Sequence, residues 1–185
     1  MKKEIKQQSI LLFEEKGFSE TSIQDIVETL GVTKGTFYYY FSSKEQLLMD
    51  IHLSYIDDLL EHQEKIQQTQ HSNREKLIQL VALLITDIAN HGPSGKVFFR
   101  EMRHLCEENA VEVKRKREQF RKNLESILRE GVAQHEFRQG IEPEIVAFAI
   151  LGITNWSYQW FNPSGEISAE HLADIYSDLV LNGIA

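Results

Sequence analysis

Apolar residues recur three and four positions apart along most of the chain, which is the spacing of one face of an α-helix. Few prolines interrupt this pattern, and no run of alternating apolar and polar residues indicates a β-strand. We therefore predict an all-α protein of about nine helices. The expected helices cover roughly residues 2–16, 23–30, 34–40, 44–62, 73–91, 96–105, 110–135, 145–161 and 168–182.

Capping sequences mark the ends of the first short helices. Ser22 and Asp25 have the spacing of a capping box, Thr33 is placed to cap the next helix, and Gly17 and Gly31 are typical helix stops. Two short helices joined by a tight glycine-containing turn have the spacing of a helix-turn-helix element. The pattern therefore indicates such an element over residues 22–41.

Charge is unevenly distributed along the chain. The formal net charge of −8 excludes a protein that coats nucleic acid with its whole surface, but it allows a local DNA-contacting element. Residues 114–140 carry eight basic and four acidic side chains, whereas residues 141–185 carry six acidic and no basic ones. We expect this cation-free, aromatic-rich last segment to be buried or self-associating.

Cysteine and histidine placement argues against an enzyme or a metal protein. The single cysteine, Cys106, excludes a disulfide framework and fits a reducing compartment, and no two histidines stand four residues apart on a helix. His104, Cys106, Glu107 and Glu108 form only a loose polar cluster, and a small buried cysteine is the usual outcome. We expect no catalytic residue, metal or cofactor, and neither a signal peptide nor a membrane span, hence a cytoplasmic protein.

The second short helix of residues 22–41 has a surface suited to DNA. If Phe37 and Phe41 point inward with Ile26, then Lys34 and the tyrosines lie on other faces of the helix. Tyrosine hydroxyls donate to phosphates, tyrosine rings contact thymine methyl groups, and a glycine permits close approach to a duplex. Three consecutive aromatic residues, Tyr38–Tyr40, cannot all be core residues of one helix.

The run from Gly17 to Leu48, which includes LGVTKGTFYYYFSSKEQLL, resembles the DNA-binding domain of the TetR family of transcriptional regulators. The resemblance covers about the first 50 residues, and the helical remainder fits the family's ligand-binding and dimerisation domain. It implies domains at 1–46 and 47–185, and a homodimeric repressor that binds a palindromic operator and leaves it when a small molecule binds. The DNA-contacting positions that it implies are Ser22, Gln24, Thr33, Lys34, Gly35, Thr36, Tyr38, Tyr39 and Lys44.

The last two predicted helices carry more apolar and aromatic residues than one buried face requires. In the family, these helices pair with their copies in a four-helix bundle. A two-fold dimer of this kind places two recognition helices about 34–36 Å apart, one turn of DNA. The alternative is that the apolar residues only cover the core of a monomer.

The sequence says less about the effector. We expect a pocket lined by residues of the helices that follow residue 77, although core packing explains each aromatic equally well. The basic residues at 114–122 are either a solvated face or a site for an anionic ligand such as an acyl-coenzyme A thioester. A helical adaptor without a DNA target, or an enzyme, are the alternative functions. The expected ligand-contacting residues are Phe98, Phe99, Arg103, Phe120, Trp156 and Trp160.

Overall fold

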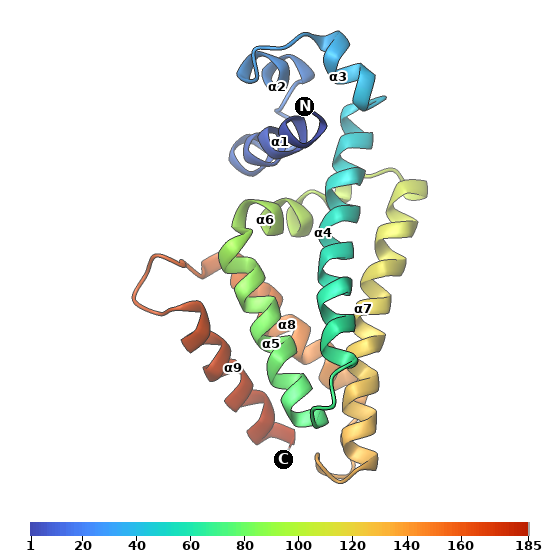
Figure 1. Ribbon diagram of the computed structural model, residues 1–185, viewed down its shortest axis with the longest axis vertical. Helices are drawn as coiled ribbons and strands as arrows, with labels where there is room; N and C mark the ends of the chain where they lie inside the picture. Colours follow the sequence, from blue (N-terminus) through green and yellow to red (C-terminus); the bar gives the residue numbers. More distant parts are fainter. Residues whose placement is uncertain (185) are drawn as a thin grey trace. The chain divides into compact units, whose positions relative to one another are not determined.

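The computed structural model describes residues 1–184, and over these residues it consists of nine α-helices and one short 3₁₀ turn (Figure 1). The predicted all-α fold is confirmed. None of the described helices is both long and apolar enough to cross a membrane. The elements are α1 Lys2–Lys16, α2 Ile23–Thr29, α3 Lys34–Tyr40, α4 Lys44–Gln67, α5 Asn73–Asn90, α6 Gly92–Arg100, η1 Met102–His104, α7 Glu107–Ala133, α8 Pro143–Trp160 and α9 Ala169–Ile184.

Local capping explains most of the helix boundaries. The Ser22 hydroxyl accepts a hydrogen bond from the backbone N–H of Asp25, and the Asp25 carboxylate accepts one from the backbone N–H of Ser22. The predicted capping box is therefore present. The main difference concerns α6, which begins at Gly92 and not near residue 96. Pro93 lies in the first turn of α6, where backbone N–H groups have no partner within the helix. Because proline lacks this N–H group, it is tolerated there, and the helix can begin at the Gly-Pro pair.

The chain divides into two compact units. The first contains Met1–Asp57 and Pro93–Arg115, and the second contains Asp58–Gly92 and the residues from Lys116 onward. The helices α4 and α7 therefore each contribute residues to both units.

In the first unit, α1, α2 and α3 pack around apolar side chains that water does not reach. Phe13, Ile26 and Phe37 are completely buried, as is Leu47 on the following helix. An ion pair and a hydrogen bond add to this packing, because the Lys6 ammonium lies 2.7 Å from the Asp50 carboxylate and donates to the hydroxyl of Ser54 at 2.5 Å. These contacts hold α1 against α4.

In the second unit, α5 lies beside α8 and α9 (Figure 1). Leu80 and Val81 of α5 belong to the same core cluster as Leu128 of α7 and Ile150 of α8. Gly131 permits a close approach within this core, since a Cβ atom there would lie 2.3 Å from the ring of Phe137.

Candidate DNA interface and effector residues

The turn between α2 and α3 requires a glycine. Gly31 has a φ of 65°, a left-handed conformation that side chains disfavour. Immediately after it, the backbone N–H of Val32 donates to the carbonyl of Val27 at 2.9 Å and closes the turn. Thr33 then caps α3 by accepting the N–H of Thr36 at 3.3 Å. The predicted helix-turn-helix geometry is therefore formed.

The helix α3 has one buried anchor and a broad exposed face. Phe37 is fully buried, with its ring centre 5.8 Å from that of buried Phe41. Because the helix turns by about 100° per residue, this anchor directs the adjacent Tyr38 and Tyr39 to solvent, where they are 53% and 81% exposed. Lys34 and Gly35 are also exposed, so they share the accessible surface of α3.

The remaining polar residues of this element make local hydrogen bonds. The Ser22 hydroxyl donates to Asp25 at 2.7 Å, and the Gln24 amide donates to Glu28 at 2.5 Å. The hydroxyls of Thr33 and Thr36 lie 3.3 Å apart. Ser22, Gln24 and Thr33 are exposed and Thr36 is half-buried, so each side chain combines a local contact with access to the surface.

Lys44 lies in a different environment from the one that its position in the sequence predicts. Its ammonium donates to the carbonyl oxygens of Phe18 and Thr21, both at 2.6 Å, and lies 4.3 Å from the centre of the Phe18 ring. Burial lowers the pKa of Lys44 from its ordinary value, although the charges of Asp25 and Glu20 oppose that shift. The ammonium thus holds the loop between α1 and α2.

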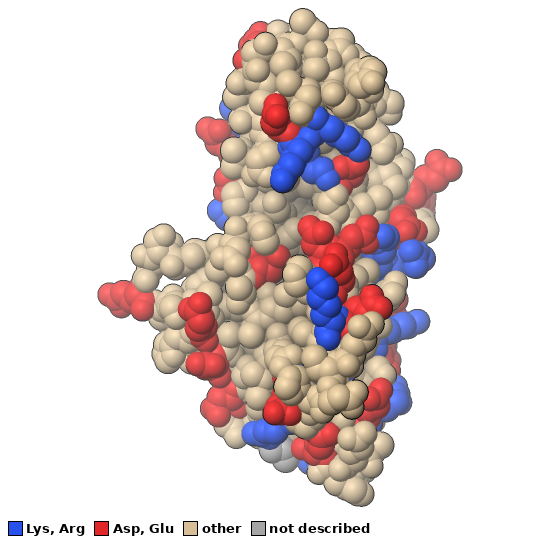
Figure 2. Space-filling view, in the orientation of Figure 1, with Lys and Arg blue, Asp and Glu red and all other residues tan. Residues whose placement is uncertain are grey.

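Few lysines of this region are available to a ligand. The ammonium groups of Lys2 and Lys6 lie 3.2 and 2.7 Å from the carboxylate of Asp50, whereas Lys3 is exposed on α1. On the face shown in Figure 2, the surface around α2 and α3 is largely free of charged side chains. Hydroxyls and aromatic rings dominate the exposed face of α3.

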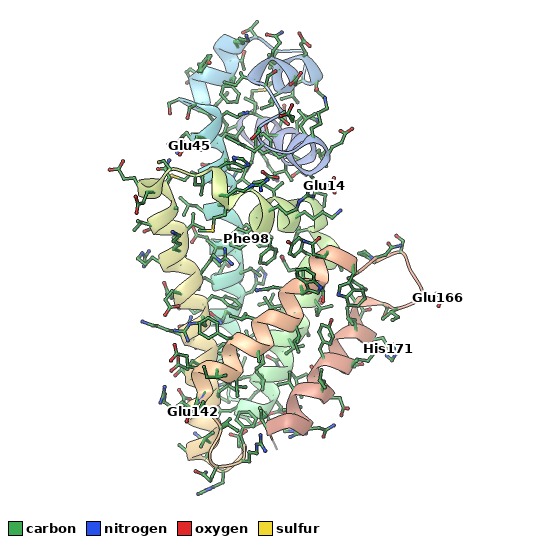
Figure 3. All side chains as sticks on the ribbon, turned by 180° about the vertical axis from the view of Figure 1, so that it is seen from behind. Glu14, Glu45, Phe98, Glu142, Glu166 and His171 are labelled. Atoms are coloured by element: carbon green, nitrogen blue, oxygen red, sulfur yellow. The ribbon has the colours of Figure 1, made fainter. Side chains whose placement is uncertain are left out.

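Three of the expected effector residues lie in the first unit, where they do not share one environment. Phe98, labelled in Figure 3, is buried, with its ring centre 4.6 Å from that of Tyr55 and 5.4 Å from that of His52. Phe99 is half-buried against Phe98. Arg103 is exposed and lies beside His104. Phe98 is therefore the member of this group that is placed most deeply among aromatic and polar side chains.

The other three expected effector residues lie in the second unit. Phe120 is buried on α7, whereas Trp156 and Trp160 on α8 are 63% and 49% exposed. Both tryptophans belong to an outward face of α8 that also includes Ile145 and Phe148. Trp156 and Trp160 thus form part of an apolar surface and do not line the interior near Phe120.

The basic residues of α7 are largely engaged by acidic neighbours. Arg115 contacts Glu112 at 2.8 Å. The buried guanidinium of Arg121 lies 2.6 Å from Glu118 and 3.0 Å from Glu125, and these hydrogen bonds raise the pKa of Arg121 above its ordinary value. Arg115 and Arg121 are therefore engaged without an anionic ligand, whereas Arg117 is half-buried and burial lowers its pKa from the ordinary value.

Cys106 differs from the sequence-based expectation, and its contact with Glu45 was not predicted. Cys106 is exposed and not buried, because it directly precedes the first turn of α7. Its backbone N–H donates to the carboxylate of Glu45 at 2.7 Å. This contact spans 61 positions, and no local pattern could have indicated it. Within residues 1–184, no three His, Cys, Asp or Glu side chains are grouped to hold a metal ion.

Comparison with known proteins identifies the family. Residues 8–51 match the model of bacterial regulatory proteins of the tetR family, and residues 70–184 match a tetracyclin repressor-like C-terminal domain. The chain belongs to the TetR family. As a TetR-family member with this helix-turn-helix geometry, it is a DNA-binding transcriptional regulator.

Several TetR-family proteins are similar over nearly the whole chain. The transcriptional repressor KstR2 of Mycolicibacterium smegmatis is 29% identical over 183 residues, which are 98% of this chain and 89% of that protein. The structure of PfmR from Thermus thermophilus is 31% identical, with a TM-score of 0.90 over 96% of this chain and 97% of that one. AibR, solved with isovaleryl coenzyme A and operator DNA, shares the fold at 24% identity, with a TM-score of 0.86 over 96% of each chain.

Proposed function

We propose that this regulator is a repressor that binds a palindromic operator as a homodimer and leaves it when a small molecule binds. The observation that carries the proposal is the exposure of Tyr39, 81% accessible on a helix anchored by the fully buried Phe37. Such a side chain contributes little to packing and is free to contact a duplex. The similarity to KstR2, which is a transcriptional repressor, supports repression as the direction of regulation.

The exposed face of α3 offers the chemistry that operator recognition needs. The hydroxyls of Tyr38 and Tyr39 can donate to phosphates, and their rings can contact thymine methyl groups. Beyond its chain neighbours and the backbone of its own helix, a Cβ atom at Gly35 would meet only the Thr33 hydroxyl oxygen, at 3.5 Å, so a duplex can approach that backbone closely. We assign supporting contacts with the DNA backbone or base edges to Lys34, Thr33, Thr36, Ser22 and Gln24.

The apolar face of α8 and α9 supports a homodimer. Ala147, Ile150 and Thr154 line the buried side of α8, while Ile145 and Trp156 on the opposite side are more than 60% exposed. Ile175 and Leu179 add exposed apolar area on α9. Exposed apolar residues that gather on neighbouring helices are typical of an interaction site, and a second copy of the chain offers the same residues about a two-fold axis.

For the effector we propose an amphipathic small molecule, with acyl-coenzyme A thioesters as the class to test first. The fold shared with AibR, whose structure contains isovaleryl coenzyme A, supports this choice. Calorimetric titration with thioesters of increasing chain length tests it. Heat of binding together with release of operator DNA is expected for at least one chain length. A panel that gives neither result would contradict the assignment.

A gel-shift assay tests DNA binding itself. The full-length protein is mixed with the DNA that precedes its own gene or a neighbouring gene, with an unrelated duplex of equal length as competitor. A shifted complex that survives the competitor is expected. Absence of a complex on every upstream region would favour a helical adaptor without a DNA target. We propose a regulatory and not an enzymatic function, and a cytoplasmic location, which is where an operator would be available to the protein.

A further inference from the structure

Glu45 lies in the first turn of α4 and contacts the start of α7. Its Oε1 atom accepts the backbone N–H of Cys106 at 2.7 Å and the side-chain amide of Asn109 at 3.0 Å. Glu45 is labelled in Figure 3. The N–H groups at the start of a helix have no partner within that helix. The carboxylate of Glu45 therefore caps α7 from a different helix.

Lys44, the residue that precedes Glu45, contacts the loop between α1 and α2. Its ammonium binds the carbonyl oxygens of Phe18 and Thr21, which belong to the loop that leads into α2. The ring of Phe18 also stacks on His104, with the ring centres 5.2 Å apart. Two consecutive residues of α4 thus hold the DNA-binding helices and the beginning of α7 within the same unit.

We propose that Glu45 is a positioning residue that couples the first turn of α7 to the DNA-binding helices. The inference rests on the proposed function, since it concerns how ligand binding reaches the operator-binding surface. The helices α4 and α7 continue to Gln67 and Ala133, so each is a continuous helix that contributes residues to both units. A ligand that displaces α7 then changes the position of α4 through the Glu45 carboxylate.

Thermodynamic reciprocity allows a test without the effector. If the start of α7 influences DNA binding, then DNA binding must influence the start of α7 by the same free energy. Amide hydrogen exchange of the segment 105–110 reports this, measured on the full-length protein with and without a saturating operator duplex. In the wild-type protein we expect the operator to slow exchange of this segment at least about fivefold, a coupling at the low end of the usual range.

Two variants of Glu45 distinguish coupling from a local cap. In Glu45→Ala, exchange of 105–110 should be equally fast with and without operator, because the connection to α4 is gone. In Glu45→Gln, an amide oxygen still accepts the N–H of Cys106, so part of the operator effect should return. Glu108→Ala is the matched control, because it removes an exposed carboxylate from the first turn of α7 and keeps Glu45, so the operator effect should persist.

Asn109→Ala tests the same contact from α7. It removes one of the two hydrogen-bond donors to Glu45, so the operator should slow exchange of this segment less than in the wild-type protein. Operator occupancy is measured in the same samples by fluorescence anisotropy. If Glu45→Ala raises exchange equally in free and bound protein but keeps the operator-induced change, Glu45 is only a local cap and the inference is wrong. If the wild-type protein binds operator without slowing this segment, the inference also fails. A wild-type protein that binds no operator would instead contradict the proposed function.

Discussion

The ammonium of Lys44 lies 2.6 Å from the carbonyl oxygen of Phe18 and 4.3 Å from the centre of the same residue's ring. The Lys44 side chain therefore donates to the backbone carbonyl of Phe18, 26 positions earlier, and also covers one face of the Phe18 ring. This relationship makes Lys44 part of the structure of the DNA-binding helices, whatever contact it makes with a phosphate.

We predict that Lys44→Ala lowers the free energy of unfolding. The substitution leaves the carbonyl oxygens of Phe18 and Thr21 without their donor, which costs about 1–2 kcal/mol. Urea unfolding followed by circular dichroism measures the change. Lys3→Ala, which removes an exposed lysine of α1, is the control and should leave the midpoint unchanged. Equal midpoints for Lys44→Ala and the wild-type protein would show that the contact adds no stability.

Local sequence determines the helix-turn-helix element, which is why it could be predicted closely. The caps at Ser22 and Thr33 and the turn at Gly31 depend on neighbouring residues only. The partners of Lys44 and Glu45 could not be predicted, because they come from segments that only the tertiary fold brings near. Aromatic residues were ambiguous for a related reason.

The aromatic residues proposed for the effector pocket illustrate this limit. Phe98 is buried against Tyr55, whereas Trp156 is exposed on α8. Both are large apolar residues at helical spacing, and core, pocket and dimer surface require the same pattern. Only the packing of neighbouring helices decides which of the three roles each residue takes.

Operator binding should depend only moderately on salt concentration. Lys2 and Lys6 contact Asp50 and Lys44 contacts loop carbonyls, so three lysines of residues 1–50 remain for phosphates in each protomer. With about 0.9 counterions released per neutralised phosphate, the slope of log affinity against log salt should not exceed about 5 in magnitude for a dimer. Anisotropy titrations at several salt concentrations measure it. A much steeper slope would mean that other cations contact the DNA. The three lysines are Lys3, Lys16 and Lys34.

Gly152→Arg should convert the protein to a monomer. Gly152 is exposed on the apolar face of α8, and a Cβ atom there would meet nothing within 4 Å in the monomer. The added charge therefore leaves each protomer folded but opposes burial against a second copy. Analytical ultracentrifugation at micromolar concentration measures the mass. Gln119→Arg, on an exposed position of α7, is the control that should remain dimeric. A dimeric Gly152→Arg protein would place the interface elsewhere.

The ion pairs between the lysines of α1 and the Asp50 carboxylate of α4 should be lost in acid. Burial raises the pKa of Asp50, but hydrogen bonds and charge from Lys6 and Lys2 outweigh burial and hold this pKa below its ordinary value. A carboxyl whose pKa is lower in the folded state stabilises that state above its unfolded pKa, and this stability disappears as the pH falls through the folded pKa. Thermal unfolding between neutral pH and about pH 3 should show a smaller loss of stability for Asp50→Asn than for the wild-type protein. Identical pH profiles would contradict this assignment.

The exposed face of α3 is the central claim, and the operator affinity of Tyr39→Ala tests it most directly. Because Tyr39 is 81% exposed, its removal should leave the urea midpoint unchanged. Anisotropy titration with the operator duplex should show binding at least about tenfold weaker, the loss expected for one good contact with DNA. An unchanged midpoint together with wild-type affinity would show that this face of α3 does not contact the operator.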